Sequence, residues 1–139
     1  MDYQVDLDPT HCVIRVTVTA EILTLELFED GHRRLSRIAS HGGPYAAIFD
    51  YSAVNSVAIS TDTLRSLAWR KPSVPAGRPH VVVGKVPVIY GLARQFQICG
   101  ESVGKELEVV HSLEEAYGIV GVRPEDFTQR LFPEQRLAA

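Results

Sequence analysis

Asp50, Ser52 and His111 are polar residues with chemistry-bearing side chains that follow apolar segments. Asp50 and Ser52 come after the apolar run 46–49, and His111 comes after the run 107–110. If both runs are parallel strands, their carboxyl ends meet at the edge where open α/β sheets bind ligands. A serine, a histidine and an aspartate there would suit a hydrolase, but the sequence has no Gly-x-Ser-x-Gly elbow to expose a nucleophile. We therefore favour a structural interpretation, in which Asp50 braces the loop that follows it.

Ser60 precedes a segment with leucines at helical spacing, Leu64 and Leu67. A serine at the start of a helix accepts an N–H hydrogen bond from the first turn, which stabilises the helix by about 1 kcal/mol. A phosphate on the same hydroxyl would be stabilised by the free amides and the helix dipole, and would change the surface charge. The same position suits a helix cap, a phosphorylation site or a partner-docking site, and these interpretations stay open. Ser52 and Asp50 are further candidates for phosphorylation or partner docking.

Tyr90, Arg94 and Trp69 are candidate ligand or interface residues. Tyr90 and Arg94 are four residues apart on one face of a predicted helix. The Arg94 guanidinium could hold a carboxylate or phosphate bidentately, or its stem could cover apolar surface. Trp69 stands at the end of another predicted helix, where it could anchor an interface or close the core.

The histidines and cysteines do not form a metal-binding pattern. The five histidines are scattered, and only His11 and Cys12 are neighbours. Adjacent residues in a strand point to opposite faces, so this pair cannot share an ion. Cys12 and Cys99 fall on apolar stripes and are expected to be small core residues. We expect neither a metal nor a cofactor.

The elements that position these residues follow from the hydrophobic pattern. Alternation predicts two strands, over residues 3–7 and 11–19, that form an antiparallel hairpin at a sheet edge. Continuous apolar runs predict interior strands over residues 45–51 and 80–84, and residues 107–110 are predicted as the last strand. Helical spacing predicts helices over residues 24–40, 60–69, 88–100 and 112–117, and a short terminal helix from residue 123. In the first helix, charges four apart predict the ion pairs Glu29–Arg33 and Asp30–Arg34.

This alternation predicts an α/β fold: a five-stranded, mixed but mostly parallel sheet with four helices plus a short C-terminal helix. The strand and helix pattern places one domain over residues 3–122, followed by a helical extension over residues 123–139.

Composition narrows the class of partner. A chain of 139 residues with a net charge of −3 lacks the basic surface that nucleic acid requires. Gly84, Lys85 and Pro87 interrupt the most apolar stretch, so we expect no membrane span. The acidic start of the chain is not typical of a signal peptide, and we expect a cytoplasmic protein.

Three segments resemble the SpoIIAA-like proteins, which are relatives of the STAS domains of anti-sigma-factor antagonists. Ile48-Phe49-Asp50-Tyr51-Ser52-Ala53-Val54 is similar to the family's strand that ends in Asp-x-Ser-Gly-Val. Ile59-Ser60-Thr61 opens the following helix, and Tyr90-Gly91-Leu92-Ala93-Arg94 is similar to a helix of the SpoIIAA-like branch. The resemblance covers about residues 3–120 and implies a small mixed sheet wound with helices, related to the lipid-binding domain of CRAL-TRIO proteins.

The resemblance implies a non-enzymatic interaction or regulatory module that docks on a protein partner or on itself as a homodimer. In the antagonists, a kinase phosphorylates one serine at the start of this helix, and the matching position is Ser60. Ala58 stands where antagonists carry an acidic residue. The alternative is a carrier of a small apolar ligand or lipid, of the CRAL-TRIO type, which would need an apolar cavity.

Overall fold

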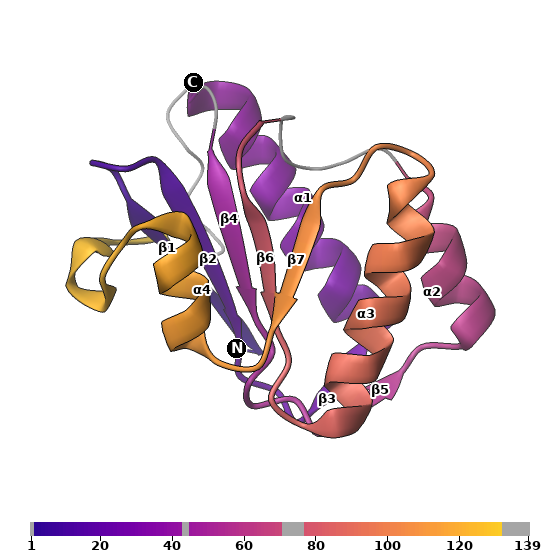
Figure 1. Cartoon of the computed structure of the whole chain (residues 1–139). Helices are drawn as coiled ribbons and strands as arrows, with labels where there is room; N and C mark the ends of the chain where they lie inside the picture. Colours follow the sequence, from indigo (N-terminus) through magenta and orange to yellow (C-terminus); the bar gives the residue numbers. More distant parts are fainter. Residues whose placement is uncertain (1, 43–44, 71–76, 132–139) are drawn as a thin grey trace.

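One mixed sheet organises the chain (Figure 1). The computed structural model describes residues 2–42, 45–70 and 77–131. Within them, six strands pair in the order β7-β6-β4-β2-β1-β8. Their bounds are β1 Tyr3–Asp8, β2 Val13–Val18, β4 Ala46–Asp50, β6 His80–Val83, β7 Leu107–Val110 and β8 Gln129–Leu131. The α/β class and the mixed sheet are confirmed, but the sheet has six strands rather than the predicted five.

The additional strand lies beyond the predicted hairpin. Strands β1 and β2 are antiparallel, as predicted, but β8 pairs antiparallel with β1, so the hairpin is not at the edge of the sheet. Asp6 of β1 accepts hydrogen bonds from Arg15 of β2 at 3.1 Å and Arg130 of β8 at 3.0 Å. The predicted short terminal helix is a 3-10 turn, Pro124–Asp126, and the rest of the expected helical extension, 132–139, lies outside the described residues.

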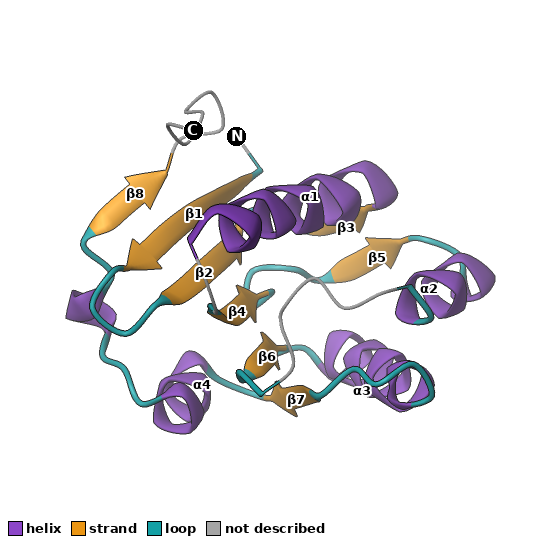
Figure 2. Cartoon of the chain, turned by 90° about the horizontal axis from the view of Figure 1, so that it is seen from above, coloured by secondary structure: helices purple, strands orange, loops and turns teal. Residues whose placement is uncertain are grey.

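Four helices of the described chain cover the sheet: α1 Leu25–Gly42, α2 Thr61–Ala68, α3 Pro87–Glu101 and α4 Leu113–Val120. The parallel strands β2, β4, β6 and β7 follow one another in a single direction across the sheet. Because such crossovers are right-handed, α1, α2 and α3 all lie on one face, and α4 lies on the other (Figure 2). The order of these four strands never reverses across the sheet.

The core has two parts, one on each face of the sheet. Ile14, Val16 and Val18 point toward α1 and α3, whereas Val13 points toward α4, which confirms the alternation predicted for β2. On the first face, α2 packs chiefly against α3, and a two-stranded parallel sheet, β3 Ile22–Thr24 with β5 Ser56–Ala58, lies beside them. The hydrophobic pattern of the sequence predicts neither of these short strands.

Ion pairs tie α1 to the end of α2. Glu29 pairs with Arg70 at 3.0 Å rather than with Arg33, which pairs instead with Asp30 at 3.0 Å. Arg70 lies just beyond α2 and opposite Glu29, so the Glu29 carboxylate pairs with Arg70 instead of with a residue of its own helix. None of the helices in the described part of the chain is long and apolar enough to cross a membrane.

Candidate functional site

An apolar cavity lies between the sheet and the three helices on its first face. Its volume is about 60 Å³. Strand residues Phe49, Val82 and Leu107 form one wall, and side chains of the helices and of β3 and β5 form the others. The remaining lining residues are Leu23, Phe28, His32, Tyr51, Val57, Leu64, His80, Ile89, Leu92, Ala93 and Phe96.

Two histidines are the only nitrogen-bearing side chains in this lining. His32 of α1 stacks between Phe28 and Phe49, with ring centroids 4.2 and 4.5 Å apart. Its Nδ1 lies 2.9 Å from the Phe28 carbonyl oxygen, which can only accept, so Nδ1 carries the proton. His80 of β6 lies against Phe49, with centroids 5.4 Å apart, and its buried Nε2 has no hydrogen-bond partner in the part of the chain that the structure describes.

Burial keeps both imidazoles neutral. It lowers the pKa of His32 to about 4, although the hydrogen bond to the Phe28 carbonyl acts in the opposite direction. Burial also lowers the pKa of His80 to about 3, and the nearby His32 and Lys105 lower it further. Burial raises the pKa of the Tyr51 phenol, which therefore stays protonated. The polar groups of the cavity are thus uncharged hydrogen-bonding groups in an apolar lining.

A wider cleft of about 370 Å³ adjoins the cavity, because Phe28, His32 and Phe96 line both. Its other walls carry the charged residues Glu29, Arg33, Arg70 and Lys105. The Lys105 ammonium donates to the Leu67 carbonyl at 3.0 Å and lies 4.9 Å from the centre of the Phe96 ring. Burial, and then the charge of Arg70, lower the pKa of Lys105. A second cleft, of about 270 Å³, lies between α2 and α3 and shares Leu64, Leu92 and Phe96 with the cavity.

The sequence-derived candidates at the carboxyl edge form two local pairs. Asp50 is buried, and its Oδ1 accepts hydrogen bonds from the Ser52 backbone N–H at 2.9 Å and from the Ser52 hydroxyl. This arrangement braces the loop after β4. Tyr90 of α3 stacks on His111, with centroids 3.8 Å apart. Each pair is therefore engaged in a contact that positions a loop or a helix.

The remaining candidates lie on α2 and α3. Ser60 is the N-cap of α2, where its hydroxyl accepts from the Thr63 N–H at 3.1 Å. Trp69 lies at the opposite end of α2, and 52% of its surface is exposed. Arg94 is exposed and donates to Gln97 at 2.7 Å. Cys12 and Cys99, expected in the core, are half-buried free thiols.

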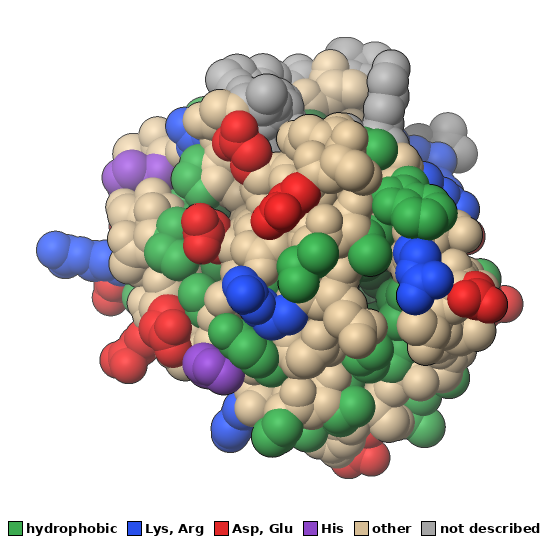
Figure 3. All heavy atoms as spheres, turned by 45° about the vertical axis from the view of Figure 1, so that its right-hand side comes forward, with side chains coloured by type: hydrophobic (Ala, Val, Ile, Leu, Met, Phe, Trp, Pro, Cys, Tyr) green, Lys and Arg blue, Asp and Glu red, His purple; other side chains and the backbone are tan. Residues whose placement is uncertain are grey.

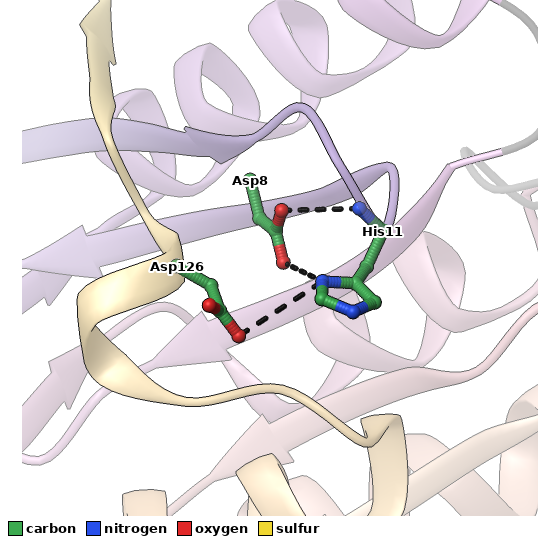
Figure 4. A group of neighbouring side chains, drawn as sticks. All are labelled: Asp8, His11 and Asp126. Atoms are coloured by element: carbon green, nitrogen blue, oxygen red, sulfur yellow. Dashed lines mark hydrogen bonds and ion pairs between the residues drawn. The ribbon is translucent and has the colours of Figure 1, made fainter.

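One further polar cluster surrounds the turn between β1 and β2 (Figure 4). The buried Asp8 accepts from the backbone N–H groups of Thr10 and His11 at 3.0 Å, and its other oxygen lies 2.7 Å from the His11 ring. Asp126 lies 3.9 Å from that ring and accepts from the Arg123 N–H. Ligand atoms of the two aspartates and His11 lie within 4.8 Å of one another, a spacing that a metal ion could use. The hydrogen bonds already explain the cluster as a turn brace and a cap.

A scan against protein-family models finds no match, and neither do searches of curated proteins and of solved structures. We therefore infer function from the geometry and the chemistry of the site.

The two cavity histidines were missed in the sequence analysis, although the sequence carries a signal for each. His32 follows Phe28 by four residues and so continues the apolar stripe of its helix. His80 directly precedes three valines, at the start of a strand that is buried on both faces. Each histidine thus stands at a position where the surrounding hydrophobic pattern predicts a buried side chain.

The neutral histidines make the protein sensitive to acid. Below the ordinary pKa of 6.5, the unfolded chain binds protons at both imidazoles while the folded chain does not. The free energy of unfolding therefore falls as the pH drops from 6.5 toward 4, by about 1.4 kcal/mol per pH unit for each histidine. We expect His80→Phe to remove about half of this dependence, and to add roughly 1–3 kcal/mol at pH 7 because no unpaired nitrogen is then buried. Urea unfolding at several pH values measures both effects, and equal slopes in the two proteins would contradict the assignment.

Proposed function

We propose that this chain is a non-enzymatic protein that binds a small apolar ligand in the cavity between its sheet and helices α1 to α3. The observation that carries the proposal is the buried Nε2 of His80, a residue of the cavity lining, which has no hydrogen-bond partner among the described residues. A buried nitrogen of this kind costs roughly 1–3 kcal/mol unless a partner satisfies it. A ligand with a hydrogen-bonding group would supply that partner.

The dimensions favour a ligand that extends beyond the cavity. About 60 Å³ holds only a few atoms, whereas sites for larger ligands measure roughly 300–1,000 Å³. The neighbouring cleft of about 370 Å³ supplies the remaining room. Phe96 lies between the two spaces and contacts both, so its rotation would join them. The ligand would therefore place an apolar part against the sheet and another part in the cleft.

The other candidate site residues already have structural roles, which also favours the cavity as the binding site. Asp50 and Ser52 hydrogen bond to one another, and Ser60 caps a helix, so each has a structural task. The resemblance to the fold of CRAL-TRIO domains points in the same direction, at the level of fold alone.

Filling the cavity tests the proposal. Ala93 of α3 lines the cavity, and Ala93→Phe would occupy its space. We expect 1-octanol to raise the melting temperature of the wild-type protein and to have little effect on the Ala93→Phe variant, because the apolar volume is taken.

Gly91→Phe is the matched control. A side chain at Gly91 meets nothing within 4 Å, so the same bulk is placed on the exposed side of the same helix. This variant should respond to 1-octanol as the wild type does. An equal response of all three proteins, or no response of the wild type, would contradict ligand binding in this cavity.

Protein docking is a second candidate function, favoured by the exposed apolar side chains on the α2–α3 side. Ile98 and Val88 of α3 are 59% and 54% exposed, and Trp69 stands at the end of α2. Hydrophobic side chains gather toward the lower right of the face in Figure 3, where this side of the molecule comes forward. We propose self-association through the cleft that Ile98 lines. Thr61 also lines that cleft, so a phosphate on the adjacent Ser60 would interfere with docking there.

Sedimentation velocity tests this second function. We expect a wild-type dimer and a monomeric Ile98→Glu variant, because a carboxylate in the interface would lose its hydration. Ile119→Glu is the control, since Ile119 is also exposed but belongs to α4 on the opposite face of the sheet. A monomeric wild type, or dimers of all three proteins, would exclude association through this cleft.

A further inference from the structure

We propose that the ligand is an amphipathic carboxylate, with its apolar chain in the cavity and its carboxylate bound by Lys105 and His80 where the cavity meets the cleft. This inference rests on the proposed function and adds to it the charge and the chemical class of the ligand. Two groups carry it that the described part of the chain leaves unsatisfied, the Lys105 ammonium without a counter-ion and the His80 Nε2 without a hydrogen-bond partner.

Lys105 is the unsatisfied charge. Of the charged groups on the wall of the cleft, Glu29 pairs with Arg70, and Arg33 pairs with Asp30. Within the described part of the chain, Lys105 forms no ion pair and donates only to the Leu67 carbonyl at 3.0 Å. An ammonium has three donors, so two remain for another acceptor. The half-buried charge lacks the compensation that such groups usually have.

The chain holds the Lys105 side chain in place. Its stem lies against α3 at Gly100, where an added Cβ would lie only 3.0 Å from the Lys105 Cδ. The backbone N–H of Lys105 also donates to the Gly100 carbonyl at 3.1 Å. The stem, the bond to the Leu67 carbonyl and the contact with the Phe96 ring together keep the ammonium in the cleft, beside a ring that also lines the cavity.

His80 is the unsatisfied nitrogen, and it lies toward the same end of the sheet. It begins β6, and its neighbour in the parallel register is Leu107 of β7, two residues after Lys105. Burial is the main cause of the lowered pKa of both His80 and His32, and the positive charge of Lys105 lowers both pKa values further. With its proton on Nε2, a neutral His80 can donate to an acceptor in the cavity.

A single carboxylate satisfies both groups. Its two oxygens can accept from the Lys105 ammonium and from the His80 Nε2–H, and its charge neutralises that of Lys105. The cleft favours an anion over a cation, because Glu29 is the only acidic residue among the described residues of its lining and already pairs with Arg70. The apolar lining behind the histidines suits a hydrocarbon chain.

Calorimetric titration of the wild-type protein at pH 7 with octanoate, 1-octanol and octylamine tests the inference. These probes share a chain and differ in the charge of the polar end. We expect octanoate to bind about tenfold tighter than 1-octanol, as a charge-assisted hydrogen bond implies, and octylamine to bind weakest. Equal binding of octanoate and 1-octanol would overturn the carboxylate while leaving the apolar site in place. Binding of none of the three would overturn both the carboxylate and the proposed function.

Variants then locate the contact. Lys105→Met keeps the length and the apolar stem of the side chain, and should bind octanoate no better than 1-octanol. Lys85→Met, which changes an exposed lysine after β6, should keep the wild-type preference. A preference for octanoate that persists in Lys105→Met would exclude Lys105 as the partner.

If Lys105→Met does not fold, the nitrogen chemical shift of His80 in the wild type decides the point. Octanoate should move it more than 1-octanol does, and equal shifts would contradict the contact.

Discussion

The winding of the sheet in one direction is the constraint on which the rest of the structure depends. Strands β2, β4, β6 and β7 follow one another across the sheet, so right-handed crossovers bring α1, α2 and α3 to the same face. On that face α2 packs chiefly against α3. Side chains such as Phe28, Phe49 and Phe96 fill most of the space behind α2, and the cavity is what they leave open.

The placement of histidines in this space gives it a chemical character that packing alone does not explain. Phenylalanine at position 80 would fill the same place without burying an unpaired nitrogen. It would also remove the loss of unfolding free energy that a buried histidine causes at acidic pH. Natural sequences tolerate such costs most often at functional sites, where binding opposes stability. The same reasoning applies to Lys105, whose half-buried ammonium lacks a counter-ion among the described residues. The unpaired His80 nitrogen and the uncompensated Lys105 charge each lower the stability of the fold. These two independent costs are the basis for proposing a ligand.

Much of the fold followed from the sequence, because long periodic segments report burial directly. The hairpin, the buried parallel strands and the four helices were predicted near their observed bounds. The three strands that were missed, β3, β5 and β8, have three residues each, too few to establish alternation. The site was harder to predict, since the polar residues that stand out in the sequence lie at the carboxyl edge of the sheet or on the outer helices. His32 and His80 come from segments far apart in the chain, and only the packing of α1 against the sheet brings them together.

A crystal structure of the protein under xenon pressure tests the central claim most directly, because xenon enters apolar cavities that proteins leave empty. We expect a xenon atom in contact with Phe49 and Phe96, and no protein atom within hydrogen-bonding distance of the His80 Nε2. A Phe96 side chain that fills the space, or a protein group bonded to that nitrogen, would contradict the account.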